Sequence, residues 1–177
     1  SLQANNKLVV YQLVKREDGS HGHRIVPIEN VEFPETHVRD INAIGIACSG
    51  KFVMSSSEDN KIVVYSLHGE LLKNIAPKLN LLYEATVTPC GRFIAASGFT
   101  PDVFVFEVVF DRQGIFQDVK RVFDLKGHTS GIPSFSFNQN SSRCVTVSKD
   151  GSWRLFNTDI RYMQGEEAKI IASGEWD

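Results

Sequence analysis

The chain repeats itself, and this repetition limits the folds it can adopt more than any other feature of the sequence. The segment NKLVVYQL at residues 6–13 returns as NKIVVYSL at residues 60–67, with six of eight positions identical at an offset of 54. A second echo, GKFV at residues 50–53 and GRFI at residues 91–94, has an offset of 41. Repeats of this length indicate stacked units, each too small to bury its own hydrophobic face.

A third copy, at an offset of 91, repeats a set of polar and aromatic residues. The paired positions are His37 with His128, Ser55 with Thr146, Asp59 with Asp150, and Tyr65 with Phe156. In the unit between them the equivalent positions hold Lys78, Ala96, Thr100 and Phe106. We therefore expect the two outer units to share a polar arrangement, and the middle unit to depend on apolar packing instead.

Each complete unit reads as four strands, because runs of β-branched and aromatic residues alternate with turn signals. The turn signals are Ser49-Gly50, Cys90-Gly91 and Asp150-Gly151. In the last unit we expect strands at residues 132–138, 144–148 and 152–157, and a fourth that begins near residue 168. A short helix at Glu166–Ala172 is the alternative for the fourth. Four-stranded units of this period are typical of β-propeller blades.

We therefore expect an all-β chain, a partial β-propeller of about three and a half four-stranded antiparallel blades. Residues 1–36 would supply the C-terminal half of one blade and a connecting loop, and full blades would follow at residues 37–77, 78–126 and 127–177. The middle blade would carry an extended outer hairpin, for which a partner-binding protrusion is the alternative interpretation. Since a ring needs more blades, we expect this chain to be part of a longer one, or two copies to pair into a ring of about seven.

The motifs resemble those of the WD-repeat family. Lys126-Gly127-His128 and the turn Lys149–Trp153 fit the family signature, although its name-giving dipeptide is degraded to Tyr65-Ser66, Phe106-Glu107 and Phe156-Asn157. The resemblance implies a non-catalytic protein-interaction scaffold. It also implies a buried hydrogen-bond network in two blades, formed by His37, Ser55, Asp59 and Tyr65 and by His128, Thr146 and Asp150. Because phenylalanine has no hydroxyl, we expect the second network to be shorter.

The same residue types could form a hydrolase site, with Ser55, His37 and Asp59 in the roles of a serine triad. A buried network is favoured, because buried polar groups need partners. No catalytic residue, cofactor or metal ligand is therefore expected. His21 and His23 are close in sequence, but we interpret that segment as a solvated hairpin tip.

Charge and composition narrow the class of partner. The formal net charge is −2, which does not favour nucleic acid, so an RNA-associated adaptor that uses exposed aromatics such as Trp153 is only an alternative. The cysteines Cys48, Cys90 and Cys144 lack the paired spacing of a disulfide framework. Without an apolar run near 18 residues, the segment is expected not to insert into a membrane and to be soluble and cytosolic.

Other proteins are the expected partners, and loops are the expected contact sites. The candidate partner-binding residues are Arg39, Glu58, Ser130 and Lys149. The stretches Cys90–Phe110 and Gly114–Asp159, with the unusual GFTPD at residues 98–102, resemble a transducin beta-like branch of the WD-repeat family. That resemblance implies a location on the cytosolic face of the endoplasmic reticulum. It also implies a link to the kinase PERK and the unfolded-protein response.

Overall fold

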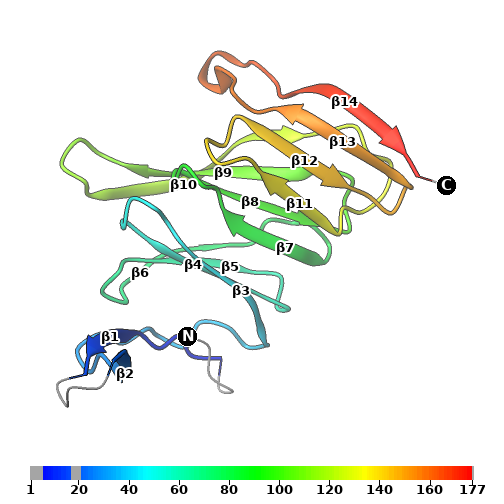
Figure 1. The fold of residues 1–177 in the computed structure, drawn as a ribbon. Coiled ribbons are helices and arrows are strands. Elements are labelled where there is room, and N and C mark those ends of the chain that lie inside the picture. Colours follow the sequence, from blue (N-terminus) through cyan, green and yellow to red (C-terminus); the bar gives the residue numbers. More distant parts are fainter. Residues whose placement is uncertain (1–5, 17–20, 177) are drawn as a thin grey trace.

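The strands form four sheets that lie one beside another in chain order (Figure 1). The computed structural model describes residues 6–16 and 21–176. One sheet has two strands and three sheets have four, and within every sheet the neighbouring strands are consecutive in the chain. The described residues thus build three complete blades after an opening hairpin, which is the architecture of a partial β-propeller.

The strands have the following bounds. The opening hairpin pairs β1 (Tyr11–Lys15) with β2 (His23–Pro27). The first full blade contains β3 (Ile41–Ile46), β4 (Val53–Ser57), β5 (Ile62–Tyr65) and β6 (Leu71–Ile75). The second contains β7 (Leu82–Val87), β8 (Phe93–Gly98), β9 (Val103–Phe110) and β10 (Phe116–Leu125). The third contains β11 (Ser134–Phe137), β12 (Arg143–Val147), β13 (Ser152–Asn157) and β14 (Lys169–Glu175).

The end of the chain is a strand, so the alternative helix at Glu166–Ala172 is wrong. A single 3-10 turn, η1, falls earlier, at Tyr162–Gln164. The following residues pair with β13 from Asn157 to Ser152. This pairing satisfies the backbone groups at the outer edge of β13 and suits the β-branched Ile170 and Ile171.

The third strand of the first full blade is buried, and both of its faces are covered. All four residues of β5 are buried. Ile62 and Val64 belong to the core shared with the second blade, whereas Val63 and Tyr65 belong to the core on the N-terminal side. Because successive side chains of a strand point to opposite faces, an uninterrupted apolar run is what a strand between two packed layers needs.

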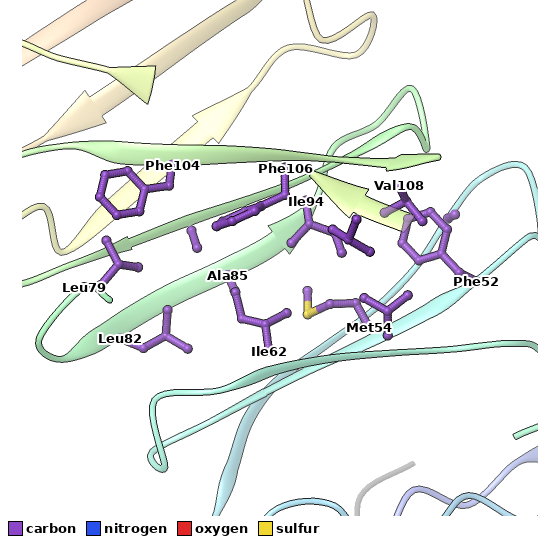
Figure 2. Close-up of a cluster of buried hydrophobic side chains, with 14 residues drawn as sticks. Phe52, Met54, Ile62, Leu79, Leu82, Ala85, Ile94, Phe104, Phe106 and Val108 are labelled. Carbon is purple, nitrogen blue, oxygen red and sulfur yellow. The ribbon is translucent and has the colours of Figure 1, made fainter. Parts of the chain in front are cut away.

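The blades are held together by apolar side chains that lie between them. Figure 2 shows the largest cluster, in which Phe52, Met54 and Ile62 of the first full blade face Ile94 and Phe106 of the second. All five side chains are buried. A similar cluster joins the second and third blades. The large apolar clusters therefore lie between blades, where each blade buries side chains against its neighbour.

The outer hairpin of the second blade is long, and it packs back onto the first. β9 and β10 pair from Val103 with Leu125 out to Phe110 with Phe116, and the hairpin projects beyond the other strands (Figure 1). The ring of Phe110 stacks on Phe52 with centroids 6.4 Å apart. The tip of this hairpin, around the exposed Ile115, is free for a partner.

Candidate functional site

A buried histidine ties the loop before β3 to the turn after β4 in the first full blade. Nδ1 of His37 lies 3.1 Å from Oδ2 of Asp59, and its Nε2 lies 2.8 Å from Oγ of Ser55. The Tyr65 hydroxyl, on β5, lies 3.4 Å from Oγ of Ser55 and also hydrogen-bonds to the hydroxyl of Thr36. The structure thus brings the four residues expected from the repeat into contact and adds Thr36.

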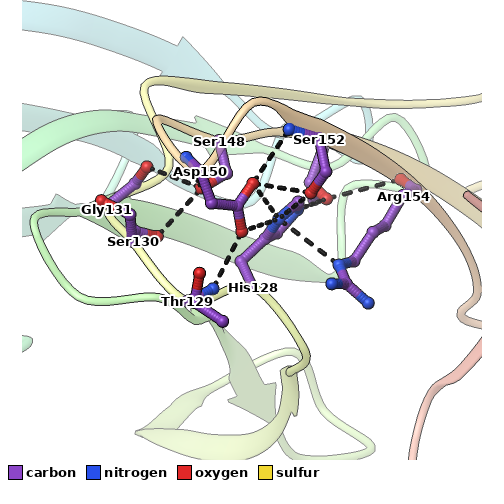
Figure 3. Close-up of polar contacts among 9 residues, drawn as sticks. His128, Thr129, Ser130, Gly131, Ser148, Asp150, Ser152 and Arg154 are labelled. Carbon is purple, nitrogen blue, oxygen red and sulfur yellow. Dashed lines mark hydrogen bonds and ion pairs between the residues drawn. The ribbon is translucent and has the colours of Figure 1, made fainter. Parts of the chain in front are cut away.

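The third full blade holds a second network of the same kind (Figure 3). Nδ1 of His128 lies 3.0 Å from Oδ2 of Asp150, and its Nε2 lies 2.8 Å from Oγ1 of Thr146. Ser152, on β13, donates a 2.6 Å hydrogen bond to Asp150 and lies 3.1 Å from Nδ1 of His128. Phe156 has no part in this network, as expected of a residue without a hydroxyl, and Ser152 adds a contact that was not expected, at Asp150 and His128 and not at Thr146.

Each aspartate also holds the backbone of the neighbouring loop. Asp59 accepts the N–H groups of Val38 at 3.2 Å and of Lys61 at 3.0 Å. Asp150 accepts the N–H group of Thr129 at 2.9 Å. Hydrogen bonds to a carboxylate are among the stronger ones in proteins, so these contacts fix the loops that lead into the first strands.

The charges in the third blade favour an ionised aspartate beside a neutral histidine. Burial opposes ionisation of Asp150, but hydrogen bonds from Ser152, Thr129 and His128 outweigh burial and hold its pKa well below the usual range. Burial lowers the pKa of His128, and the nearby Arg154 cation acts in the same direction, against Asp150. Because the carboxylate can only accept, Nδ1 of the neutral ring carries the proton and Nε2 accepts from Thr146.

In the first full blade, Asp59, His37 and Ser55 are hydrogen-bonded in the same order as the residues of a catalytic triad. Their surroundings differ from those of a triad. The side chain of Ser55 is 0% exposed, and its oxygen contacts both His37 and Tyr65. A triad serine must reach a substrate carbonyl. In this arrangement no substrate can approach Oγ, so the geometry is that of an internal brace.

The middle blade has no counterpart of these networks among its equivalent residues. Lys78 is exposed, whereas Ala96 and Phe106 are part of the core shared with the first full blade. Oγ1 of Thr100 and Oγ of Ser97 are buried without a hydrogen-bond partner. This blade is held by apolar packing from both sides.

We expect replacement of Asp150 by alanine to lower the free energy of unfolding by about 1–3 kcal/mol, because His128 and the Thr129 N–H lose their acceptor. Thermal and urea unfolding of the two proteins measure this difference. Asp40→Ala, which removes an exposed carboxylate, is the matched control and should leave stability within about 0.5 kcal/mol. Equal stability of Asp150→Ala and the parent chain would contradict a bracing role.

The neutral state of His128 should make stability depend on pH. Its pKa is lowered in the folded chain, whereas the unfolded imidazole titrates at about 6.5. Below about pH 6.5 the unfolded chain binds a proton that the folded chain excludes, so stability present above this pH is lost as the pH falls. The contribution cannot exceed about 1.4 kcal/mol per pH unit.

Unfolding at a series of pH values between about 7.5 and 5.5 tests this expectation. His128→Gln should flatten the profile relative to the parent chain. The exposed His21→Gln changes the histidine count without touching the network and should leave the profile unchanged. A His128→Gln profile as steep as that of the parent would show that another group is responsible.

The loops held by the networks lie on one face of the stacked blades. Within the first full blade the Glu58 N–H bonds to the Asp40 carbonyl, and in the third the Lys149 N–H bonds to the Gly131 carbonyl. Between blades, the Lys149 ammonium donates a 3.0 Å bond to the Tyr83 hydroxyl. The backbone and side-chain contacts place the ends of all three blades at a common surface, which we call the loop face.

The four candidate partner-binding residues all lie on the loop face, but they do not touch one another in the described contacts. Arg39, Glu58 and Lys149 are exposed, and Ser130 is half-buried. The carbonyl groups of Arg39 and Ser130 each accept a serine hydroxyl from the turn of the same blade, at 3.0 and 3.1 Å. Their backbones are therefore fixed while three of the side chains are accessible.

Sequence reasoning missed the apolar residues of the loop face. Phe99 is 58% exposed, Val38 79% and Leu81 45%. Phe99 occupies the repeat position of Glu58 and Lys149, since the offsets of 41 and 91 lead from residue 58 to residues 99 and 149. The repeat therefore carried the signal for Phe99. Exposed aromatic side chains on a rigid surface are common anchors in protein interfaces.

Other chemistry that the sequence raised receives little support from the placement of its residues. Among residues 6–16 and 21–176, no group of three or more histidine, cysteine, aspartate or glutamate side chains could hold a metal ion. Trp153, the aromatic considered for RNA stacking, is half-buried and packs against Gly174. Within the described part of the chain, no helix has the length and apolarity of a membrane span.

Comparison with known proteins agrees with the repeat. The family model for the WD domain, G-beta repeat, matches residues 29–66 and 119–157, the two stretches that contain the histidine networks. Transducin beta-like protein 2 from Homo sapiens is 40% identical over 176 residues, and that from Mus musculus 39%. Both alignments cover 99% of this chain and 39% of the relative, so the chain spans about two fifths of the length of these relatives.

A more distant relative, Actin-interacting protein 1 from Drosophila melanogaster, is 24% identical over 64% of this chain and 18% of its own length. WD repeats of this kind typically serve as scaffolds for protein–protein interaction. The repeated blades, the braced loops and the matches over both network-bearing stretches lead to one assignment. The chain contains WD repeats at residues 29–66 and 119–157 and is similar over nearly its whole length to transducin beta-like protein 2.

Proposed function

We propose that this chain is a docking platform of a scaffold protein and that it binds partner proteins through the loop face. The observation that carries the proposal is the contrast between buried and exposed groups there. The histidine networks fix the loop backbones of the two outer blades, where Val38 is exposed, and the hydrogen bond from the Phe99 N–H to the Leu81 carbonyl fixes the loops of the middle blade, where Phe99 and Leu81 are exposed. A surface that is rigid before binding loses little conformational entropy when a partner docks.

Charge adds selectivity to this surface. Lys149 lies over the ring of Tyr83, with Nζ 4.7 Å from the ring centroid, and remains exposed beside the apolar residues. Since an aromatic anchor and a nearby cation suit an acidic segment with a hydrophobic residue, we propose that partners present such a segment.

The similarity to transducin beta-like protein 2 extends the proposal to a cellular location and to a partner protein. We propose that the chain works at the cytosolic face of the endoplasmic reticulum and that the kinase PERK is one of its partners in the unfolded-protein response. The resemblance in sequence supports this part of the proposal, and the geometry of the loop face supports only the mode of binding.

Binding of the purified chain to the recombinant cytosolic region of PERK tests both parts. We expect Phe99→Asp and Lys149→Glu each to weaken binding about tenfold or more, because they remove the anchor and reverse the local charge. The matched control is Ile115→Asp, which places the same charge on an exposed apolar residue at the hairpin tip, away from the loop face. The control should bind like the parent chain.

The outcomes separate the two parts of the proposal. Loss of binding in Ile115→Asp with retention in Phe99→Asp would assign docking to the outer hairpin. Complete absence of binding by the parent chain would remove PERK as a direct partner of these blades. The next measurement would then be the binding of the loop face to acidic segments with a hydrophobic residue from other candidate partners.

A second set of exposed apolar side chains lies away from the loop face. These side chains are Ile170 and Ile171 on β14, and Ile44 and Ile46 on β3, which line a pocket with residues of the opening segment. We propose that in the isolated chain a second copy covers them, since two copies supply about the seven blades of a closed ring. Light scattering that finds a stable monomer at high concentration would reject this pairing.

A further inference from the structure

Two exposed cysteines occupy equivalent turns of neighbouring blades. Cys48 lies in the turn between β3 and β4, and Cys90 lies in the turn between β7 and β8. Each turn is closed by a 2.8 Å backbone hydrogen bond, from Gly50 to the Ala47 carbonyl and from Gly91 to the Thr88 carbonyl. Because the blades stack side by side, the two turns are neighbours at the surface opposite the loop face.

The contact between these turns brings one thiol to the other turn. A Cβ atom on Gly91 would lie 2.7 Å from Sγ of Cys48 and 3.0 Å from its backbone nitrogen. The thiol of Cys48 therefore rests on the backbone of the residue that directly follows Cys90. Gly91 has a φ of +71°, so this close approach and this backbone conformation both require glycine.

Hydroxyl groups from two neighbouring blades contact Cys90. Its Sγ lies 3.3 Å from Oγ1 of Thr88, and its backbone N–H bonds to Oγ of Ser141 in the turn of the next blade. Burial opposes ionisation of this thiol, but bonds from Ser141, Thr88 and the backbone of Arg92 outweigh burial and lower its pKa.

The surface around Cys90 is a shallow groove with two cations and one carboxylate. Lys51, Arg92 and Glu107 line the groove together with Cys90, and Arg92 is paired with Glu107 at 2.6 Å. Positive charge beside a thiol stabilises the thiolate, which is the form that reacts with oxidants and electrophiles. The exposed location and the hydrogen-bond donors favour reaction at this sulfur.

We propose that Cys90 and Cys48 form a redox-active pair that closes a disulfide between neighbouring blades when the protein meets hydrogen peroxide. Cys90 is the attacking residue and Cys48 is the resolving residue. The resulting bond joins the β7–β8 turn to the β3–β4 turn.

The reaction proceeds in two balanced steps. The Cys90 thiolate attacks one oxygen of hydrogen peroxide, the O–O bond breaks, hydroxide leaves, and the sulfur becomes a sulfenic acid. The Cys48 sulfur then attacks the Cys90 sulfur, an S–S bond forms, and the sulfenic oxygen leaves as water. Two thiols and one peroxide thereby give one disulfide and two waters.

The third cysteine is an internal control. Cys144 lies on β12 in the core between the second and third blades, and burial raises its pKa to about 12. A buried thiol of this kind is protonated at neutral pH and out of reach of solutes. We expect Cys144 to remain reduced and unlabelled until the chain unfolds.

Intact-mass measurement and peptide mapping after treatment with hydrogen peroxide test the proposal. The parent chain and Cys144→Ser should each lose two hydrogen atoms and yield a peptide that joins Cys48 to Cys90. Cys90→Ser should keep its mass, and Cys48→Ser should hold a sulfenic acid at Cys90 that dimedone traps. An unchanged parent mass, or a disulfide between two chains, would overturn the proposal.

A second measurement is independent of disulfide formation. Ser141→Ala removes a donor to the Cys90 sulfur, so we expect iodoacetamide to label Cys90 several-fold more slowly at neutral pH. At high pH, where the thiol is ionised without help, the variant and the parent should react at equal rates. Thermal melts establish that each variant is folded, and a Ser141→Ala rate equal to that of the parent at all pH values would contradict the role of the donors.

Discussion

Replacing Gly98 with alanine is expected to lower the free energy of unfolding by about 3 kcal/mol or more, at the upper end of what overpacking costs. Gly98 ends β8, and a Cβ atom there would lie 2.1 Å from the carbonyl oxygen of Leu81 and 2.8 Å from Cβ of Leu79. The Leu81 carbonyl already accepts the Phe99 N–H at 2.9 Å, and the Gly98 carbonyl accepts the N–H of Ile132 in the next blade. Backbone must therefore move, and the link between two blades moves with it.

Urea unfolding of Gly98→Ala against Gly45→Ala isolates this backbone clash. Gly45 lies within β3, and a Cβ atom there meets chiefly the Cγ2 methyl of Val87, a side-chain atom that can shift. Neither glycine has a φ in the left-handed region, so the comparison does not include backbone strain. If Gly98→Ala were no less stable than Gly45→Ala, the loop before β7 would have to be looser than the structure shows.

Replacing Phe156 with alanine is expected to destabilise the chain by about 3–5 kcal/mol. Phe156 lies on β13 and is 0% exposed, in the core that also contains Val103, Leu125 and Ile132. Two of these contacts come from the second blade, so the cavity would open at the boundary between blades. The loss combines the apolar area no longer buried with the cavity that the neighbours cannot refill.

Two further variants allow the stability loss of Phe156→Ala to be compared with smaller changes. Phe156→Leu retains part of the volume and should be clearly less harmful than Phe156→Ala. Phe99→Ala removes the same side chain from a position that is 58% exposed and should change stability by no more than about 0.5 kcal/mol. An effect of Phe156→Ala no larger than that of Phe99→Ala would mean that the core between these blades is not closed.

The sequence was most informative where a position is set by backbone register. The offset of 91 relates His37 to His128 and Asp59 to Asp150, and the structure places both pairs in the same hydrogen-bonded arrangement. Repeated strands bring equivalent residues to equivalent places, so position in the repeat was enough to group these side chains. The four-stranded blades followed from the same pattern.

What the sequence could not provide depends on side-chain geometry between distant segments. Ser152 extends the network of the third blade because its hydroxyl contacts both Asp150 and His128, and a repeat aligned on Tyr65 and Phe156 does not reveal this contact. The exposure of Phe99 is a second case, since its repeat position was visible but its accessibility was not. The end of the chain is a third, because a strand and a short helix were both compatible with Glu166–Ala172 until pairing with β13 decided between them.

The burial of β5 on both faces has a consequence for the order in which the blades unfold. Each blade is stabilised mainly by its two neighbours, so the free energy of the array behaves as a sum of nearest-neighbour couplings. In the isolated chain, a blade at either end has one coupling fewer than a blade in the middle, so local opening of this isolated chain should begin at the ends and move inward. Backbone amides of β8 and β9, enclosed by apolar clusters on both sides, should then exchange with deuterium last.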